Sequence, residues 1–182
     1  METNSHSPLK NFLNPFSYFS ARQMKVLVIY HSRTGNTEKL AKAVVEGVKS
    51  EGVECVLKRA NEVRREDFLE ADGIIAGSPV YFGSMASELK KVFDDFVDIR
   101  EEMEGKIGAA FATSGDDSGG KETTLLSIIQ AMLIYGMIVV GDPMDATGHY
   151  GVSCKGKPSP KDLENAKKLG RRVANLVKRL RT

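Results

Sequence analysis

The chain has 182 residues, which suits one compact domain with a sizeable core and is short for two. Hydrophobic residues make up 41% and charged residues 27%, and this ordinary usage excludes the disordered, collagen-like and membrane classes. The formal net charge is only +2, with basic and acidic residues interspersed, so we expect no nucleic-acid partner. No apolar run approaches the roughly 18 residues that cross a bilayer, so we expect no membrane partner either.

Cysteine usage and the N-terminal segment give two further expectations. Cys55 and Cys154 lie far apart and show neither CxxC nor histidine spacing, which predicts free thiols in a reducing cytoplasm and no metal site. Residues 1–23 contain aromatic side chains but lack the continuous apolar region and early basic cluster of a signal peptide. We expect an N-terminal extension over 1–23 and one folded domain over 24–182.

From Lys25 onward, short runs rich in Val, Ile and Ala predict strands that are covered on both faces. These runs are KVLVIY at 25–30, VECVLKR at 53–59, GIIAGS at 73–78, IGAAFATS at 107–114 and MIVVG at 137–141. The segments between them have apolar residues at three- and four-residue spacing, which is typical of amphipathic helices. They cover 37–52, 84–99, 122–136 and the basic stretch 159–180, with a shorter helical segment within 61–71.

The strict alternation of strands and helices predicts right-handed crossovers and a parallel sheet between two helix layers. The expected fold class is α/β, a doubly wound parallel sheet. In such sheets ligands bind beyond the carboxyl ends of the strands, where the strand order reverses. The loops after the first, third and fourth strands therefore form the candidate site.

The first loop, HSRTGNT, gathers hydroxyl groups around one glycine at the start of a helix. A helix N-terminus presents unpaired N–H groups and the positive end of its dipole, and both favour a phosphate group. Helix capping alone needs one residue, Asn36 or Thr37. Because the loop offers more than capping requires, we predict a phosphate site. Its residues are Ser32, Arg33, Thr34, Gly35, Asn36 and Thr37.

The second loop, GSPVYFGSM at 77–85, presents two aromatic rings beside a stiffening proline. Aromatic side chains on a ligand-facing loop can cover a flat heteroaromatic ring. We expect one of the two rings to pack under the following helix, and the ring that stays exposed to cover the ligand. The candidate residues are Pro79, Val80, Tyr81, Phe82 and Gly83.

The third loop, TSGDDSGGKET at 113–123, comes close to the P-loop spacing GxxxxGK. Glu122 stands where that motif needs Ser or Thr to hold magnesium, so we do not predict ATP hydrolysis. Flexible backbone rich in N–H groups can instead bond the polar edge of a ring, and the alternative is an ordinary surface loop. The candidate residues are Thr113, Ser114, Gly115, Asp116, Asp117, Ser118 and Gly119.

Together the loops describe a ligand with a phosphate at one end and a flat polar ring at the other, and FMN fits that description. SRTGNT resembles the phosphate loop of flavodoxins. GSPVYFGSMASELKKVFD and TSGDDSGGKETTLLSIIQAMLIYGMIVVG resemble the WrbA family of flavodoxin-like NAD(P)H:quinone oxidoreductases. The resemblance implies a five-stranded sheet in the order 2-1-3-4-5 with helices on both faces. It also implies that 32–37 take the phosphate, 80–82 border the isoalloxazine, and 114–119 contact its polar edge and the ribityl chain.

The same resemblance implies a reaction. NAD(P)H, as co-substrate, gives a hydride to FMN, and a quinone or other small acceptor then takes two electrons. It implies no catalytic acid, base or nucleophile in the protein, and a homo-oligomer, either a dimer or a tetramer. The alternative is a flavodoxin-type electron carrier, but such carriers are usually strongly acidic and this chain is not. His149 and Tyr150 lie either near the flavin face or in an ordinary surface loop.

The chain departs from the WrbA pattern at three places. Ile134 and Tyr135 stand where the family commonly has histidines, one of them close to the flavin. Thr34 stands where the family commonly has an aromatic residue, and the segment between the second and third strands is shorter. These differences bear on the nicotinamide contacts, the quinone specificity and the assembly.

Overall fold

A computed structural model describes residues 23–181 of the protein, so the predicted extension lies outside the described residues apart from Gln23. The strands are β1 (Lys25–Tyr30), β2 (Glu54–Arg59), β3 (Gly73–Pro79), β4 (Ile107–Ser114), β5 (Ile138–Val139) and β6 (Val152–Lys155). The helices are α1 (Asn36–Lys49), α2 (Arg65–Glu70), α3 (Ser87–Asp95), α4 (Lys121–Ile134) and α5 (Pro160–Arg181), with 3-10 turns η2 (Ala60–Glu62) and η3 (Val97–Met103).

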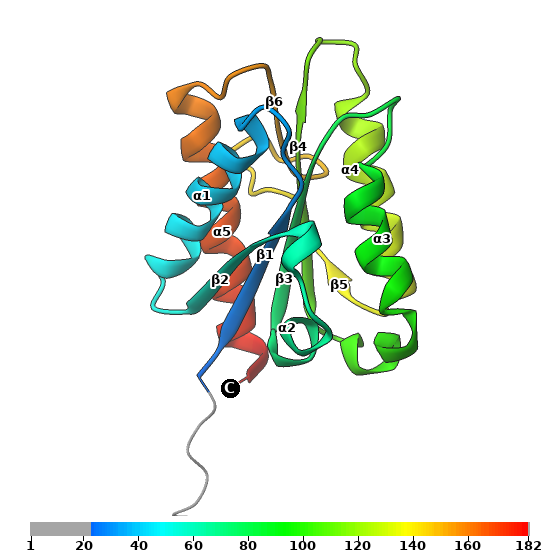
Figure 1. Ribbon diagram of the computed structural model, residues 1–182. Coiled ribbons are helices and arrows are strands. Elements are labelled where there is room, and N and C mark those ends of the chain that lie inside the picture. Colours follow the sequence, from blue (N-terminus) through cyan, green and yellow to red (C-terminus); the bar gives the residue numbers. More distant parts are fainter. Residues whose placement is uncertain (1–22, 182) are drawn as a thin grey trace, which may run out of the picture.

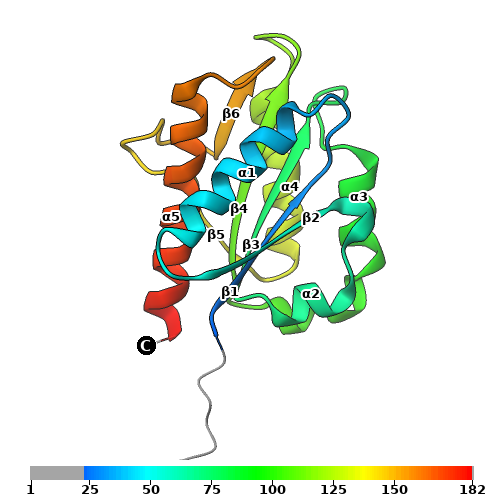
Figure 2. The ribbon, with the colours of Figure 1, turned by 60° about the vertical axis from the view of Figure 1, so that its left-hand side comes forward.

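The strands form one parallel sheet in the order β2-β1-β3-β4-β5, which confirms the predicted fold. Helices α1 and α5 pack together on one face, and α3 and α4 cover the other (Figures 1 and 2). Each face has its own apolar core, because β1, β3 and β4 are buried along almost their whole length. Among the described helices, none is long and apolar enough to cross a bilayer.

The expected fifth strand is divided into two pieces along the same edge of β4. β5 pairs with the first two residues of β4, and β6 pairs with its last four, from Phe111 to Ser114. Residues 140–151 leave the sheet between the two pieces. The division matters for the site, because β6 brings a further chain segment to the carboxyl end of β4.

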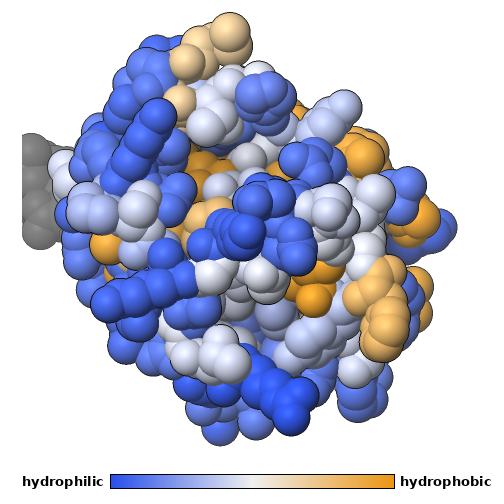
Figure 3. Space-filling view, turned by 90° about the horizontal axis from the view of Figure 1, so that it is seen from above, coloured by the Kyte–Doolittle hydropathy of each residue, from blue (hydrophilic) through white to orange (hydrophobic). Residues whose placement is uncertain are grey.

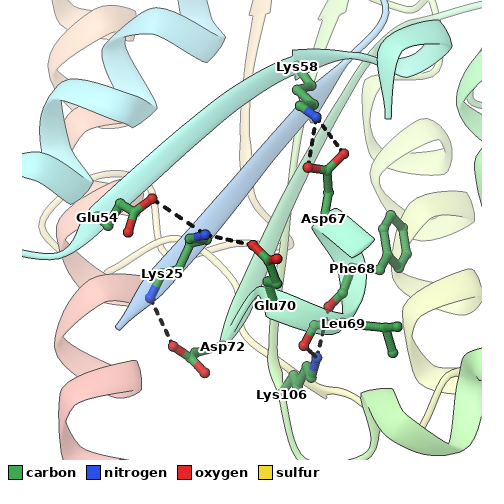
Figure 4. A network of polar contacts seen from close by, with 9 residues as sticks. All are labelled: Lys25, Glu54, Lys58, Asp67, Phe68, Leu69, Glu70, Asp72 and Lys106. Atoms are coloured by element: carbon green, nitrogen blue, oxygen red, sulfur yellow. Dashed lines mark hydrogen bonds and ion pairs between the residues drawn. The ribbon is translucent and has the colours of Figure 1, made fainter. Parts of the chain in front are cut away.

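The opposite end of the sheet is held by a network of polar contacts around α2 (Figure 4). The Lys106 Nζ donates to the backbone carbonyls of Phe68 and Leu69, at 2.8 and 2.9 Å, near the C-terminus of α2. The Lys25 N–H donates to Asp72 at 2.8 Å, just before β3. Carbonyl groups at a helix end need such partners, so the network fixes this short helix to the sheet away from the candidate site.

Candidate functional site

The three predicted loops meet at the carboxyl end of the sheet and enclose one pocket of about 340 Å³. Seen from this end, the surface is mostly polar, with apolar surface in separate patches between polar side chains (Figure 3). The lining residues are Arg33, Thr34, Asn36, Thr37, Pro79, Val80, Tyr81, Thr113, Ser114, Gly115 and Gly156. Ten of these eleven residues were predicted from the sequence, and the eleventh is Gly156.

The first loop has the backbone geometry of an anion cradle. Gly35 is the N-cap of α1 with φ of +87°, and as a glycine it has no side chain to cap the helix. Within residues 23–181, the N–H groups of Thr34, Asn36 and Thr37 donate no hydrogen bond to the protein. Unpaired N–H groups at the start of a helix attract a phosphate, so the loop fits the phosphate end of the predicted ligand.

Ser32 has a different place from the one the sequence indicated. Its side chain is buried, and its Oγ accepts hydrogen bonds from the N–H groups of Gly35 at 3.1 Å and Glu38 at 3.4 Å. Its carbonyl accepts a hydrogen bond from Arg59 at 3.3 Å, and Arg59 also pairs with Glu38 at 2.6 Å. Ser32 therefore shapes the loop from beneath, and its hydroxyl does not line the pocket.

A buried hydrogen bond joins the first loop to the third. The Oγ1 atoms of Thr37 and Thr113 lie 2.8 Å apart, and both residues line the pocket. Ser114 closes the base of the third loop by accepting a hydrogen bond from the Asp116 N–H at 3.0 Å. The relative position of the two loops is thus fixed by side chains as well as by the sheet.

The second loop turns through two residues with positive φ, Phe82 at +51° and Gly83 at +75°. Tyr81 and Ser84 exchange backbone hydrogen bonds of 3.1 and 3.0 Å on either side, which is the pattern of a tight type I′ turn. The turn sends the Tyr81 ring into the pocket wall and leaves Phe82 fully exposed at the tip. Phe82 is thus the ring that stays exposed, and the half-buried Tyr81 ring packs against His31.

The rest of the third loop lies beyond the pocket lining. Asp116, Asp117 and Ser118 are exposed, and Asp117 pairs with Lys155 of β6 at 2.7 Å. The hydrogen bond from Lys155 lowers the pKa of Asp117. Predicted contacts of 116–119 and of Phe82 and Gly83 with a ligand therefore stay predictions.

Gly156 is the lining residue that the sequence analysis missed. It follows β6, and its N–H donates to the Ser114 carbonyl at 2.7 Å, which brings it to the carboxyl end of β4. Its φ is +62° and no atom lies within 4 Å of where a side chain would begin, so the glycine keeps this side of the pocket open. The sequence signal for Gly156 is the turn GKP after VSCK. This turn points to the pocket only when VSCK is known to be a strand of the sheet.

The other residues that the resemblance singled out do not line the pocket. Tyr135 is buried at the end of α4, where its hydroxyl donates to the Phe93 carbonyl and burial raises its pKa to about 12. Ile134 is exposed on the outer side of α4. His149 and Tyr150 belong to the segment between β5 and β6, which the buried Asp142 holds by accepting the N–H groups of 147–149. This supports the surface-loop interpretation of these two residues.

Acid–base groups are scarce at the pocket. Among its lining residues in the described chain, only Arg33 and Tyr81 have ionisable side chains. Burial raises the pKa of Cys55 and of Cys154 to about 12, so neither thiol is a nucleophile near neutral pH. No cluster of metal-ligating side chains exists within residues 23–181. The arrangement can bind and orient a ligand.

Comparison of sequences identifies the relatives of this chain. The family profile described as NADPH-dependent FMN reductase matches residues 58–150. A protein of Aquifex aeolicus named flavodoxin is 43% identical over 161 residues, covering 84% of this chain and 86% of the relative. A protein of Archaeoglobus fulgidus named NAD(P)H dehydrogenase (quinone) is 37% identical over 188 residues, covering 86% of this chain and 98% of the relative.

Comparison of structures gives neighbours that are described as flavodoxins. A flavodoxin from the domain Archaea superposes with a TM-score of 0.73 and 33% identity, covering 85% of this chain and 99% of its own. A flavodoxin described as WrbA-like, from Agrobacterium tumefaciens, superposes with a TM-score of 0.75 and 26% identity, covering 86% and 99%. Proteins named flavodoxin and a protein named NAD(P)H dehydrogenase (quinone) are thus both similar to this chain.

Proposed function

Because this chain belongs to the NADPH-dependent FMN reductase family and has the flavodoxin-like fold, we propose that it is an FMN-dependent oxidoreductase that passes two electrons from NADPH or NADH to a quinone or similar acceptor. The observation that carries the proposal is the pocket. It combines an N–H cradle at one end, an aromatic wall at the other, and an exposed aromatic residue at its margin.

The residues of the pocket fit FMN from end to end. The N–H groups of Thr34, Asn36 and Thr37 would hold the phosphate together with the Thr34 hydroxyl, since these groups have no partner within the described chain. Thr113, Ser114 and Gly115 would run beside the ribityl chain, and Tyr81 would border the ring system. Gly156 leaves room on the side where β6 ends.

Two exposed side chains are suited to the second substrates. Arg33 makes no ion pair within residues 23–181, so its guanidinium is available to a phosphate of the nicotinamide nucleotide. Phe82 offers a ring to solvent beside the pocket, where the flat ring of a quinone can stack on it. The strained backbone at Phe82 supports a functional role, because such strain is concentrated at binding sites.

In this proposal the flavin supplies the hydride and electron transfer when bound. The protein binds it, orients it and leaves one side accessible. The pocket lining contains no carboxylate or imidazole, and the proposal assigns no general acid or base to it. The small net charge of +2 also differs from the strongly acidic surface by which carriers steer toward basic partners.

The second candidate is an electron carrier that turns over no substrate of its own. It is supported by the relative named flavodoxin and by Thr34, which makes the first loop similar to that of a flavodoxin. An accessible flavin serves a carrier as well as a reductase. The two candidates therefore differ in reaction with nicotinamide nucleotides rather than in cofactor.

We also expect a homo-oligomer, a dimer or a tetramer. Apolar side chains are exposed over α4 and its neighbours, at Val97, Leu133, Ile134 and Ile138. Two of them, Val97 and Ile134, line a groove between α3 and α4 that has a volume of about 240 Å³. Exposed apolar surface is typical of protein interfaces when it gathers in one place.

An anaerobic titration tests the proposal. The FMN-loaded protein is titrated with NADPH and then NADH while the visible absorbance of the flavin is followed, and benzoquinone is added last. We expect bleaching by at least one nucleotide and recovery with benzoquinone. A bound flavin that dithionite bleaches but neither nucleotide does would contradict the reductase and support the carrier. Failure to bind FMN would contradict both.

A variant pair makes the titration specific to the site. Arg33→Gln is expected to slow bleaching by the preferred nucleotide when the titration is made at saturating FMN, because it removes an exposed charge beside the pocket. Arg100→Gln removes another exposed arginine, located in η3, and is expected to leave the bleaching rate unchanged. Equal effects of the two changes would contradict the role of Arg33.

A further inference from the structure

His31 is placed between the candidate pocket and α3 by the alternation of side chains along β1. Ile29 belongs to the core under α3 and α4, whereas Tyr30 belongs to the core under α1 and α5. The His31 N–H donates to the Gly77 carbonyl at 3.1 Å, so the pairing of β1 with β3 continues one residue beyond the strand. Because successive side chains of a strand alternate, His31 emerges on the α3 side, at the carboxyl end of the sheet.

Two groups meet the imidazole there. The rings of His31 and Tyr81 pack edge to face with centroids 6.1 Å apart. The His31 Nε2 lies 3.7 Å from Oε1 of Glu88, the second residue of α3. The imidazole thus lies between a carboxylate and the ring that forms the pocket wall, and it is itself half-buried.

The position of Glu88 in the first turn of α3 stabilises its carboxylate. A carboxylate in the first turn of a helix is stabilised by the N–H groups and the dipole. The hydrogen bond from its own backbone N–H lowers the pKa of Glu88, and the charge of His31 lowers it further. The Glu88 carboxylate therefore remains ionised at neutral pH. The imidazole side chain of histidine changes its charge between about pH 5 and 8, and its attraction to Glu88 changes with it.

The other groups around His31 do not duplicate this pair. β3 presents the uncharged Gly77 carbonyl, and the loop after β3 presents Tyr81. η2 also packs on α3, but its carboxylate, Glu62, accepts a hydrogen bond from the Arg59 N–H at 3.2 Å. Arg33 lies two residues along the chain and carries an exposed guanidinium group. Within residues 23–181, Glu88 is the ion-pair partner of His31.

We propose that His31 is a positioning residue for the pocket: it supports the ring of Tyr81, and its pairing with Glu88 makes that support, and hence the affinity for FMN, depend on the charge of the imidazole. A charged imidazole is drawn to Glu88, and this attraction fixes the imidazole ring that packs against Tyr81. The Tyr81 ring is therefore held most firmly when the imidazole is charged. This inference rests on FMN binding at the proposed site and not on the reductase activity.

The first test measures FMN affinity against pH in the wild type and in matched variants. His31→Gln removes the charge change, and His149→Gln removes the exposed histidine of the β5–β6 segment, which lies outside the pocket lining. The FMN phosphate titrates equally in all proteins, so the ratio of each variant Kd to the wild-type Kd is compared at pH 6 and pH 8. For His31→Gln we expect the Kd ratio at pH 6 to be roughly two- to fivefold larger than the ratio at pH 8. A factor of this size corresponds to the free energy of a partly exposed ion pair. For His149→Gln we expect it to stay constant.

Glu88 provides a second variant pair on the surface of α3. Glu88→Gln is expected to weaken FMN binding more at pH 6 than at pH 8, as His31→Gln does. Glu88→Asp keeps the carboxylate, so we expect a smaller loss of FMN affinity than for Glu88→Gln. A ratio that is constant with pH for both His31→Gln and Glu88→Gln would overturn the proposal. So would an effect of His149→Gln equal to that of His31→Gln.

The second test uses the protein without flavin, so that it is independent of cofactor binding and of activity. Ring resonances of Tyr81 are followed by NMR between pH 5 and 8. We expect them to shift with the titration of His31 in the wild type and to be insensitive to pH in His31→Gln. Tyr81 resonances that are independent of pH in the wild type would overturn the proposal, whether or not the protein reduces quinones.

Discussion

The hydroxyl groups of Thr37 and Thr113 lie 2.8 Å apart, although 76 positions separate them in the sequence. One residue belongs to the first turn of α1 and the other to β4, and both are buried beneath the pocket. Thr113→Val or Thr37→Val leaves the remaining hydroxyl without its partner, which costs about 1–3 kcal/mol. We expect the free energy of unfolding, measured with urea, to fall clearly less in the double variant than the sum of the decreases in the two single variants. Additive losses would show that the two hydroxyl groups do not interact.

Gly35 allows a test of the cradle that separates backbone strain from binding. Gly35→Ala is expected to lower the free energy of unfolding by about 1 kcal/mol, since an alanine is disfavoured at φ of +87°. Gly52→Ala is the control, because it has φ of +74° and equally open space but lies in the turn before β2. We expect the FMN Kd to rise about tenfold for Gly35→Ala, the equivalent of one charge-assisted hydrogen bond, and to stay constant for Gly52→Ala.

The turn at Phe82 can be relaxed without changing its shape. Asn followed by Gly is the preferred pair in a type I′ turn, so Phe82→Asn is expected to stabilise the protein by about 1 kcal/mol. The same change removes the exposed ring, and we expect the KM for a quinone to increase while the FMN Kd stays the same. Phe82→Trp keeps an aromatic ring and should keep the KM. A large change in the FMN Kd for Phe82→Asn would place this ring against the flavin instead.

Asp142 makes the stability of the segment between β5 and β6 dependent on pH. Burial alone would raise the pKa of this carboxyl, but hydrogen bonds from Thr147, Gly148 and His149 outweigh it and leave the pKa lowered. A lowered pKa in the folded state means that the contribution to stability is present above about pH 4, the unfolded value, and is lost as the pH falls through the folded pKa. Asp142→Asn is expected to cost about 1–3 kcal/mol at pH 7, and the difference from wild type should shrink below pH 4.

The control for Asp142 is Asp145→Asn in the same segment. Asp145 is exposed and pairs only at the surface with Lys168, at 3.1 Å, so its replacement should change stability little at any pH. Thermal unfolding of both variants from pH 3 to 7 gives the comparison. A difference between Asp142→Asn and wild type that does not change with pH would show that the carboxylate charge is not what holds the segment.

The outer face of α4 is the place to test self-association. Ile134→Asp puts a charge on the apolar groove between α3 and α4, and we expect the mass in solution to shift toward that of a monomer. Met144→Asp is the control, because Met144 is also exposed and apolar but lies in the segment between β5 and β6. Sedimentation equilibrium measures both variants. An unchanged mass for Ile134→Asp would exclude this face as the interface.

The fold could be predicted because its signals are local. Runs such as GIIAGS and IGAAFATS became β3 and β4, and the spacing of apolar residues marked the helices around them. Parallel pairing then followed from alternation, and the loops at the carboxyl ends followed from the pairing. The first loop was also visible from the sequence, since its hydroxyl residues and its glycine are neighbours along the chain.

The remainder depended on contacts between distant residues. VSCK is too short to identify as a strand, and it becomes β6 only because β4 offers it an edge, so Gly156 was missed. The orientation of Tyr81 and Phe82 depends on a turn whose left-handed geometry a phenylalanine does not signal. The position of Ser32 beneath its loop depends on Arg59, which arrives from β2.

The divided edge strand also affects how these molecules behave in concentrated solution. An open sheet edge exposes a row of unpaired N–H and C=O groups, and a strand of another molecule can add to it and begin aggregation. Here that edge consists of two residues in β5 and four in β6, separated by a segment that leaves the sheet. At the other edge, β2 carries Glu54, Lys58 and Arg59, whose charges oppose the addition of an apolar strand. The protein is thereby protected against growth of its sheet from one molecule to the next.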